Sequence, residues 1–320
     1  MLGMTTSRIT SVAVAITAVT LASSTASFGA ENAPAVSPAR DAQRAPQQAR
    51  GTMPAEPSSY GWPVKPFRTQ HPVRGFFGDP RISNHGESRQ FHFGIDISAP
   101  NGTPVYATMS GTAHIHALHS TTIAIVGSND VEFSYWHVIP VVRSGQHVSA
   151  YRTVIGHIEE PYGHVHFSEK HGGRYLNPLR PGALGPFSDE TRPSVRSAVV
   201  DQSGELVVEA YDETPLAVPR PWHDLPVMPA LVRGHIRDAK GRTIQGWTTL
   251  ADFRLTIPSA SVFDDVWADG VMQNHVRAPG RYRLVLAHDL RPGRYIVEVT
   301  VSDTRGNAGR ARFRLDVSDR

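Results

Sequence analysis

Two pairs of residues have the side-chain types and spacing that a metal-dependent site would need. The first pair is His92 and Asp96, separated by Phe93-Gly94-Ile95, and the second is His164 and His166. Imidazole nitrogen and carboxylate oxygen are two of the three donor types that bind zinc in proteins, and the chain has no cysteine to supply the third. Any metal site in this protein therefore depends on histidine and carboxylate ligands.

The spacing of His92 and Asp96 sets a condition on the backbone between them. Ligand atoms of one zinc ion lie about 3–4 Å from each other, whereas positions i and i+4 of a straight strand are about 13 Å apart. The chain must therefore bend if the two residues share an ion, and a bend costs least at Gly94. Taken alone, this motif slightly favours the other interpretation, an ordinary strand with a solvent-facing aspartate.

The second pair, His164 and His166, has the period of a β-strand. Residues i and i+2 face the same side, roughly 6.5 Å apart, so that one imidazole could bind a metal while the other addresses water or substrate. This pattern is weak on its own, because His114 and His116 have the same spacing. We interpret His114 and His116 as one face of a strand.

A third motif, Tyr135-Trp136-His137, completes an ordered series of His-x-x-x-Asp, Tyr-x-His and His-x-His. This series resembles the lysostaphin and LytM-type zinc endopeptidases of peptidoglycan, across about residues 74–180. The resemblance extends to the flanking segments 77–81, 99–107, 110–111, 155–156 and 177–178, and to Gly145 and Val148.

The resemblance implies the duplicated hybrid motif fold and a role for each motif residue. His92, Asp96 and His166 would be the ligands of one Zn²⁺ ion, and His137 and His164 would be catalytic. Zinc with these three ligands keeps an open position, where it activates water and polarises a scissile carbonyl. The two catalytic histidines would transfer protons and stabilise the oxyanion, and the sequence leaves open which of them is the general base.

The function that this resemblance predicts is a secreted zinc metalloendopeptidase that hydrolyses peptide bonds in peptidoglycan cross-links or stem peptides. The alternative is a catalytically silent relative that binds the wall or regulates another hydrolase. Retention of all five positions favours the active enzyme, because silent relatives usually lose ligands. Three departures bear on substrate preference more than on metal binding: the short segment 157–163, Ser168 where the family often has Glu, and Tyr151 where a turn glycine is common.

The elements that must position these residues are predicted to be β-strands. Short apolar runs bounded by Gly, Asn, Asp and Pro fill residues 59–187, with no long helical period. After a polar joint at residues 186–193, a new strand series begins, with runs at 206–211, 231–236, 282–287, 295–301 and 311–317. We therefore expect an all-β protein, with an antiparallel zinc peptidase domain over 59–187 and an immunoglobulin-like β-sandwich over 190–320.

The N-terminal segment has the composition of an export signal. Arg8 precedes an apolar stretch at residues 9–22, and Ser24-Thr25-Ala26 fits a cleavage site. We expect a signal peptide over 1–26, with an uncleaved membrane anchor as the alternative, and a disordered linker or pro-segment over 27–58. The predicted location is extracytoplasmic, with no stable membrane span after cleavage.

Charge and composition narrow the expected partners. The formal net charge is +3, which suits an anionic surface such as a cell wall and equally suits an ordinary solvated surface. The chain has no basic run interleaved with aromatic residues, so nucleic acid is not a predicted partner. Peptidoglycan or a peptide is the expected substrate.

Overall fold

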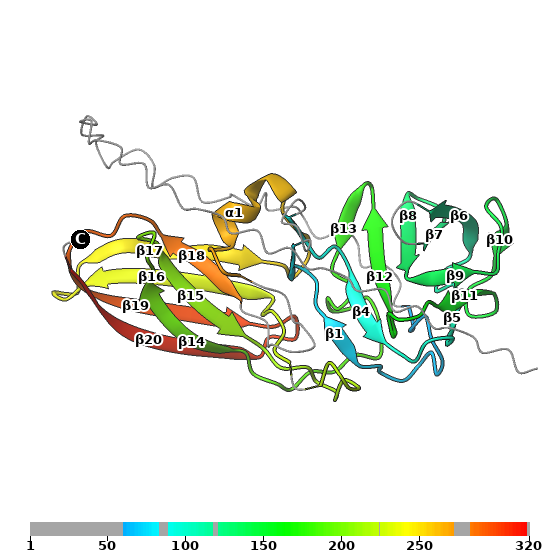
Figure 1. Cartoon of the computed structure of the whole chain (residues 1–320), viewed down its shortest axis with the longest axis horizontal. Helices are drawn as coiled ribbons and strands as arrows, with labels where there is room; N and C mark the ends of the chain where they lie inside the picture. Colours follow the sequence, from blue (N-terminus) through cyan, green and yellow to red (C-terminus); the bar gives the residue numbers. More distant parts are fainter. Residues whose placement is uncertain (1–59, 83–88, 118–120, 224, 272–281, 319–320) are drawn as a thin grey trace, which may run out of the picture. The chain divides into compact units, whose positions relative to one another are not determined.

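The computed structural model describes residues 60–82, 89–117, 121–223, 225–271 and 282–318, and the predicted signal peptide and linker lie outside these ranges. The described chain is almost entirely β-structure with antiparallel strand pairs (Figure 1). The predicted all-β class is therefore confirmed. Within these ranges the helical elements are the 3-10 turn η1 (Ala260–Val262) and the short helix α1 (Phe263–Val266). Neither could span a membrane.

The N-terminal region is built on an eight-stranded sheet with the order β1-β4-β12-β8-β7-β6-β10, in which β13 also pairs with β12 (Figure 1). A three-stranded sheet, β5-β11-β9, and the pair β2-β3 complete the region. The bounds are β1 (Val73–Gly75), β2 (Pro80–Ile82), β3 (Arg89–Phe91), β4 (Ile95–Ser98), β5 (Pro104–Tyr106), β6 (Gly111–Ala117), β7 (Thr121–Val126), β8 (Val131–Trp136), β9 (Val138–Pro140), β10 (His147–Val148), β11 (Val154–Ile158), β12 (His164–His171) and β13 (Arg174–Leu176).

Strand β12 alternates apolar and polar side chains, and this alternation fixes its register. Val165 and Phe167 are fully buried, and the Phe167 ring stacks on Phe133 of β8 with centroids 5.4 Å apart. His164 and His166 are on the other face of the strand, because successive side chains point in opposite directions. A slip by one residue would move both histidines into the apolar core, so burial of the apolar residues also holds the histidines in place.

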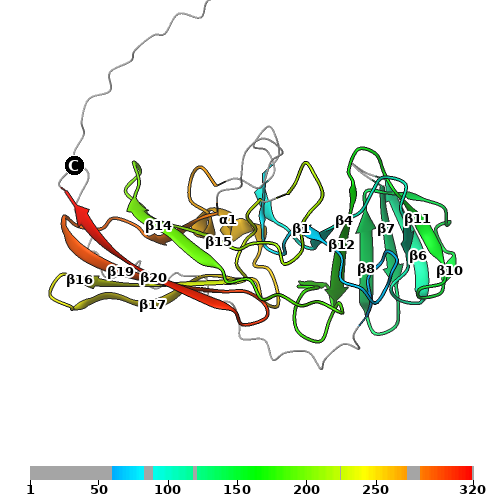
Figure 2. The same ribbon diagram turned by 90° about the horizontal axis from the view of Figure 1, so that it is seen from below.

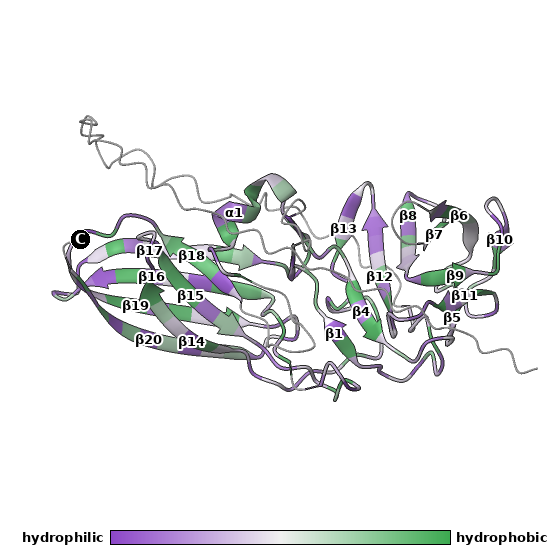
Figure 3. Cartoon of the chain, viewed as in Figure 1, coloured by the Kyte–Doolittle hydropathy of each residue, from purple (hydrophilic) through white to green (hydrophobic). Residues whose placement is uncertain are grey.

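The C-terminal region contains two antiparallel sheets, ordered β14-β15-β18 and β17-β16-β19-β20, which Figure 2 shows as separate layers. Figure 3 shows apolar and polar residues interspersed along their strands, as expected where one face of each sheet is buried. The bounds are β14 (Ser194–Val200), β15 (Leu206–Tyr211), β16 (Leu231–Asp238), β17 (Thr243–Asp252), β18 (Arg283–Ala287), β19 (Gly293–Ser302) and β20 (Ala308–Val317). The immunoglobulin-like assignment of this region stays a prediction.

Residues that follow β17 pack against the N-terminal region. Phe253 is fully buried, and its ring lies 5.6 Å from that of Phe91 on β3. The ring also covers Gly78, where an added Cβ would lie 2.2 Å from Phe253 Cγ. The side-chain amide of Asn177 donates to the Phe253 carbonyl at 2.8 Å. The domain boundary expected between residues 187 and 190 stays a prediction. A chain truncated at this boundary would lose the contacts of Phe253 with Phe91, Gly78 and Asn177.

Candidate metal centre

The register of the central strand brings one predicted ligand opposite another. Strand β12 lies between β4 and β8, and His166 is directly opposite Asp96 on β4 and Trp136 on β8. Directly opposite residues of an antiparallel pair share a face, with Cβ atoms about 4.5–5.5 Å apart. His164, two residues earlier on β12, has the same orientation. Sheet geometry alone therefore places Asp96, His166 and His164 on one surface.

His92 reaches this surface because the chain bends between two strands. Strand β3 ends at Phe91 and β4 begins at Ile95, so residues 92–94 form the bend that the spacing of His92 and Asp96 required. The backbone of His92 is fixed on both sides: its N–H donates to the Asp79 carbonyl and its carbonyl accepts from Gly78 N, each at 2.8 Å.

Gly94 allows the bend to lie directly against strand β12. A Cβ at this position would be 2.5 Å from the Phe167 carbonyl oxygen and 2.8 Å from His166 Nε2. Neither distance leaves room for a methyl group, so the absence of a side chain is what lets the backbone of the bend pass beside a predicted ligand.

Donor atoms of His92, Asp96 and His166 converge within 4.8 Å of one another. His92 Nε2 lies 2.8 Å from His166 Nδ1, and each of these nitrogens lies 3.2 Å from Asp96 Oδ1. The ligands of one zinc ion need mutual distances of about 3–4 Å, so two imidazoles and one carboxylate in this arrangement fit zinc. The structure thus brings together the three predicted ligands, and their role as ligands stays a prediction.

Neighbouring groups orient these donor atoms. The Phe76 carbonyl accepts from His92 Nδ1 at 2.8 Å, which leaves the Nε2 lone pair for the group of donors. Arg81 Nη2 donates to Asp96 Oδ2 at 2.8 Å and so holds the carboxylate with Oδ1 towards the histidines. Contacts of this kind fix ring tautomers and carboxylate orientation before a metal binds.

Burial and neighbouring charges together set the ionisation of the three predicted ligands. Desolvation lowers the pKa of His92, and it lowers the pKa of His166 to about 4. Burial opposes the ionisation of Asp96, but the nearby His92, His164 and Arg81 hold the pKa of this carboxyl well below its ordinary value. At neutral pH the group therefore contains two neutral imidazoles and one carboxylate, which is the ionisation state that binds a metal ion.

His164 lies beside these residues and contacts Asp96, Arg74 and Tyr162. Its Nε2 is 3.5 Å from Asp96 Oδ1, and its Nδ1 is 2.6 Å from Arg74 Nη2. The Tyr162 carbonyl oxygen lies 2.9 Å from the same Nδ1. A guanidinium can only donate and a carbonyl can only accept, so the two contacts of Nδ1 call for opposite tautomers and do not assign the ring proton.

His137 follows β8 and lies next to His164, with ring centroids 4.7 Å apart. Its backbone has φ of +62°, a conformation that is uncommon outside glycine and concentrates at functional sites. The ring stacks on Tyr162 with centroids 3.9 Å apart, and Nδ1 is buried without a hydrogen-bond partner in the described part of the chain. Burial, with a contribution from His164, lowers the pKa of His137 to about 3, so this ring is also neutral.

The sequence did not identify Arg74 and Arg81 as site residues. Arg81 belongs to the segment 77–81 that carried the family resemblance, but Arg74 had no motif around it. His114 and His116, which have the same spacing as His164 and His166, lie on β6 with exposed side chains. Neither belongs to the group of donors.

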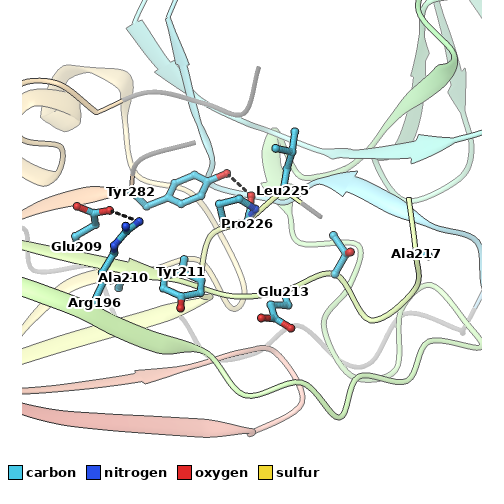
Figure 4. A pocket seen from close by; sticks show the side chains of 10 residues that line it. Arg196, Glu209, Ala210, Tyr211, Glu213, Ala217, Leu225, Pro226 and Tyr282 are labelled. Atoms are coloured by element: carbon cyan, nitrogen blue, oxygen red, sulfur yellow. Dashed lines mark hydrogen bonds and ion pairs between the residues drawn. The ribbon is translucent and has the colours of Figure 1, made fainter. Parts of the chain in front are cut away.

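A separate cavity of about 370 Å³ lies in the C-terminal region (Figure 4). Across its walls Tyr282 Oη donates to the Pro226 carbonyl at 3.2 Å, and Arg196 pairs with Glu209 at 3.6 Å (Figure 4). None of the five predicted site residues lines this cavity, so it is not part of the candidate metal centre.

Comparison with known proteins identifies a family for part of the chain. Residues 90–178, which contain all five predicted site residues, match Peptidase family M23. Similar solved structures include a SpoIIIAH and SpoIIQ complex (20% identity, 38% of this chain and 98% of that chain, TM-score 0.31). A second is a zinc containing peptidase from Vibrio cholerae (23% identity, 38% of this chain and 39% of that chain, TM-score 0.32). A third is the catalytic domain of lysostaphin from Staphylococcus simulans (24% identity, 33% of this chain and 86% of that chain, TM-score 0.27). No curated protein matches the chain.

Proposed function

We propose that this chain, whose residues 90–178 match Peptidase family M23, is a zinc metalloendopeptidase that cleaves peptide bonds of peptidoglycan. The observation that carries this proposal is the convergence of His92 Nε2, His166 Nδ1 and Asp96 Oδ1, with two further histidines beside them. An extracytoplasmic location follows from the same proposal, because that is where peptidoglycan lies.

In this proposal His92, Asp96 and His166 hold one zinc ion. When bound, zinc supplies a Lewis acid that polarises the scissile carbonyl and lowers the pKa of water. The chain itself contributes the orientation of the donors: the Phe76 carbonyl fixes the His92 ring, and Arg81 fixes the Asp96 carboxylate. Such outer contacts keep the ligands in place and are worth about 10–100-fold in metal affinity.

In the same proposal the two remaining histidines stabilise the oxyanion and transfer protons. His164, whose Nε2 lies 3.5 Å from Asp96 Oδ1, stabilises the negative charge that develops on the carbonyl oxygen. His137 lies next to His164, with Nδ1 buried and without a partner in the described part of the chain, and its task in this proposal is proton transfer between the attacking water and the leaving amine.

The test is digestion of purified sacculi by the zinc-loaded chain, with the released fragments identified by mass. We expect peptide fragments from the zinc-loaded protein and none after a chelator has removed the metal. His116→Ala is the matched control, because it removes an exposed histidine outside the centre, and it should digest as the wild type does. A protein that holds one equivalent of zinc and releases nothing from sacculi or from a glycine-rich peptide would be the catalytically silent relative.

A further inference from the structure

Three buried aspartates lie together in the C-terminal region, away from the histidines. One oxygen from each of Asp189, Asp212 and Asp303 lies within 4.8 Å of the others. Asp189 belongs to the joint that precedes β14, Asp212 directly follows β15, and Asp303 directly follows β19. Their exposed fractions are 8%, 1% and 5%, so three carboxylates share one desolvated place.

The charges of these three side chains are not balanced by ion pairs. Burial raises the pKa of Asp212 to about 7, and Asp189 and Asp303 add to this rise. Arg305 is a nearby cation whose charge acts on Asp189, but no ion pair within the described ranges includes any of the three carboxylates. Buried charges of one sign are costly unless a partner or a metal ion balances them.

Among the described residues, the hydrogen bonds of the group leave one fully buried carboxylate oxygen without a donor. Asp303 accepts from the backbone N–H groups of Arg305 and Asn307, at 2.8 Å and 2.9 Å. Asp212 Oδ1 accepts from Glu213 N at 2.8 Å, whereas Asp212 Oδ2 has no partner although the residue is 99% buried. Oδ2 belongs to the same carboxylate that contributes an oxygen to the group, so the group contains a buried acceptor with no hydrogen-bond donor in the described part of the chain.

We infer that Asp189, Asp212 and Asp303 form a binding site for a hard divalent cation, and that its occupant is calcium. Calcium binds oxygen ligands at about 2.3–2.6 Å, so two ligands on opposite sides of one ion are about 4.6–5.2 Å apart, and the mutual distances of up to 4.8 Å fit. All three donors are carboxylates, which select calcium or magnesium over zinc. Magnesium keeps most of its water and uses one or two carboxylates, whereas three protein carboxylates at one point suit calcium.

The position of the site gives the cation a structural role. Asn307 Nδ2 donates to the Asp189 carbonyl at 2.8 Å and to Asp303 Oδ2 at 2.6 Å, so the joint is already tied to the loop after β19. A cation bound to Asp189, Asp212 and Asp303 would tie the joint to the ends of β15 and β19 together. Calcium would therefore hold the joint that contains Asp189 in a fixed position against the ends of strands β15 and β19.

The experiment uses the full chain, stripped of metal and then reconstituted with one equivalent of zinc. Calcium chloride is titrated calorimetrically, and the melting temperature is recorded with calcium and with chelator. We expect about one calcium ion per chain with a Kd at or below about 10⁻³ M, the scale of extracellular calcium modules. At about a hundredfold excess over Kd, the melting temperature should rise by about 5 °C.

Asp303→Asn tests the site directly, because asparagine keeps the side-chain oxygen that accepts from Arg305 and Asn307 but removes the charge. This variant should lose the calcium-dependent shift. It also loses the Oδ2 acceptor of Asn307 Nδ2, so its melting temperature in calcium is compared with its own value in chelator. Asp238→Asn is the matched control, since Asp238 Oδ1 accepts from the N–H groups two and four residues later in the same way but lies outside the group. The control should keep the full shift.

Asp189→Asn repeats the measurement if Asp303→Asn does not fold. Absence of saturable calcium binding by the wild type up to about 10 mM would overturn the inference. So would a calcium-dependent shift of equal size in the wild type and in Asp303→Asn. Zinc content and sacculus digestion are recorded in parallel, so failure of the peptidase proposal would be seen separately.

Discussion

Replacing Gly94 with alanine tests whether the bend between His92 and Asp96 is the feature that assembles the metal centre. The new Cβ would lie 2.5 Å from the Phe167 carbonyl oxygen and 2.8 Å from His166 Nε2. Ordinary contact begins at 3.4 Å, so the two distances fall short by about 0.9 Å and 0.6 Å. The carbonyl belongs to the central strand β12 and cannot yield easily, so the bend or the His166 ring must move.

The expected cost follows from these distances. Overpacking of a well-packed site costs about 1–3 kcal/mol, which lowers the melting temperature of a chain of this size by about 2–10 °C. Zinc sites tolerate errors of about 0.2 Å in ligand distance, and a displacement of about 0.6 Å is three times larger. We therefore expect Gly94→Ala to weaken zinc binding by at least about tenfold, the lower end of the loss seen when ligand support is removed.

Zinc affinity is measured by competition with a chromophoric chelator, and stability by thermal melting of the same samples. Gly246→Ala is the matched control, because nothing lies within 4 Å of its added Cβ and its backbone has no positive φ. Gly75→Ala would place a Cβ 2.3 Å from Asp96 Oδ2, and it should weaken zinc binding as Gly94→Ala does. Wild-type zinc affinity and melting temperature in Gly94→Ala would refute the idea that this bend positions the ligands.

Three further outcomes are expected. His137→Ala and His164→Ala should each keep one equivalent of zinc but lose at least about a hundredfold in turnover, because the two side chains transfer protons and stabilise the oxyanion. Loss of zinc in either variant would make that residue a ligand. Phe253→Ala should lower the free energy of unfolding by about 3–5 kcal/mol, because the Phe253 side chain is fully buried. It should also weaken zinc binding, because the Phe253 ring packs on Gly78, whose N–H donates to the His92 carbonyl. Unchanged zinc affinity would mean that the residues after β17 do not support the centre. His116→Ala should change neither zinc content nor turnover, and a clear fall in either would indicate a second metal or a different centre.

Local sequence patterns predicted several strands of the C-terminal region. The run at 206–211 coincides with β15, and the runs at 231–236, 295–301 and 311–317 lie inside β16, β19 and β20. Strands β14 (Ser194–Val200) and β17 (Thr243–Asp252) were missed. Burial alone does not separate them from β20, which has no buried residue and was predicted because Ala311, Phe313, Leu315 and Val317 alternate with charged residues.

The candidate site was predictable only where its residues carry a recognisable spacing. His92, Asp96, His137, His164 and His166 lie in three short motifs, and the need for a bend followed from distances alone. Contacts such as those of Arg74 with His164 and Phe253 with Gly78 join residues far apart in the chain. Nothing in the sequence around either residue indicates such a partner, because tertiary packing and not local propensity creates the pair.

The two groups of possible ligands in this chain differ in the metal that their chemistry selects. The histidine group offers two imidazole nitrogens and one carboxylate, with two more histidines alongside, which suits a borderline-soft ion such as zinc. The aspartate group offers only carboxylates and has no histidine among its donors, which suits a hard ion that stabilises structure. One protein can therefore keep a catalytic and a structural cation apart by donor type alone, and exchange of Asp212 for His should draw zinc into the second group and weaken its preference for calcium.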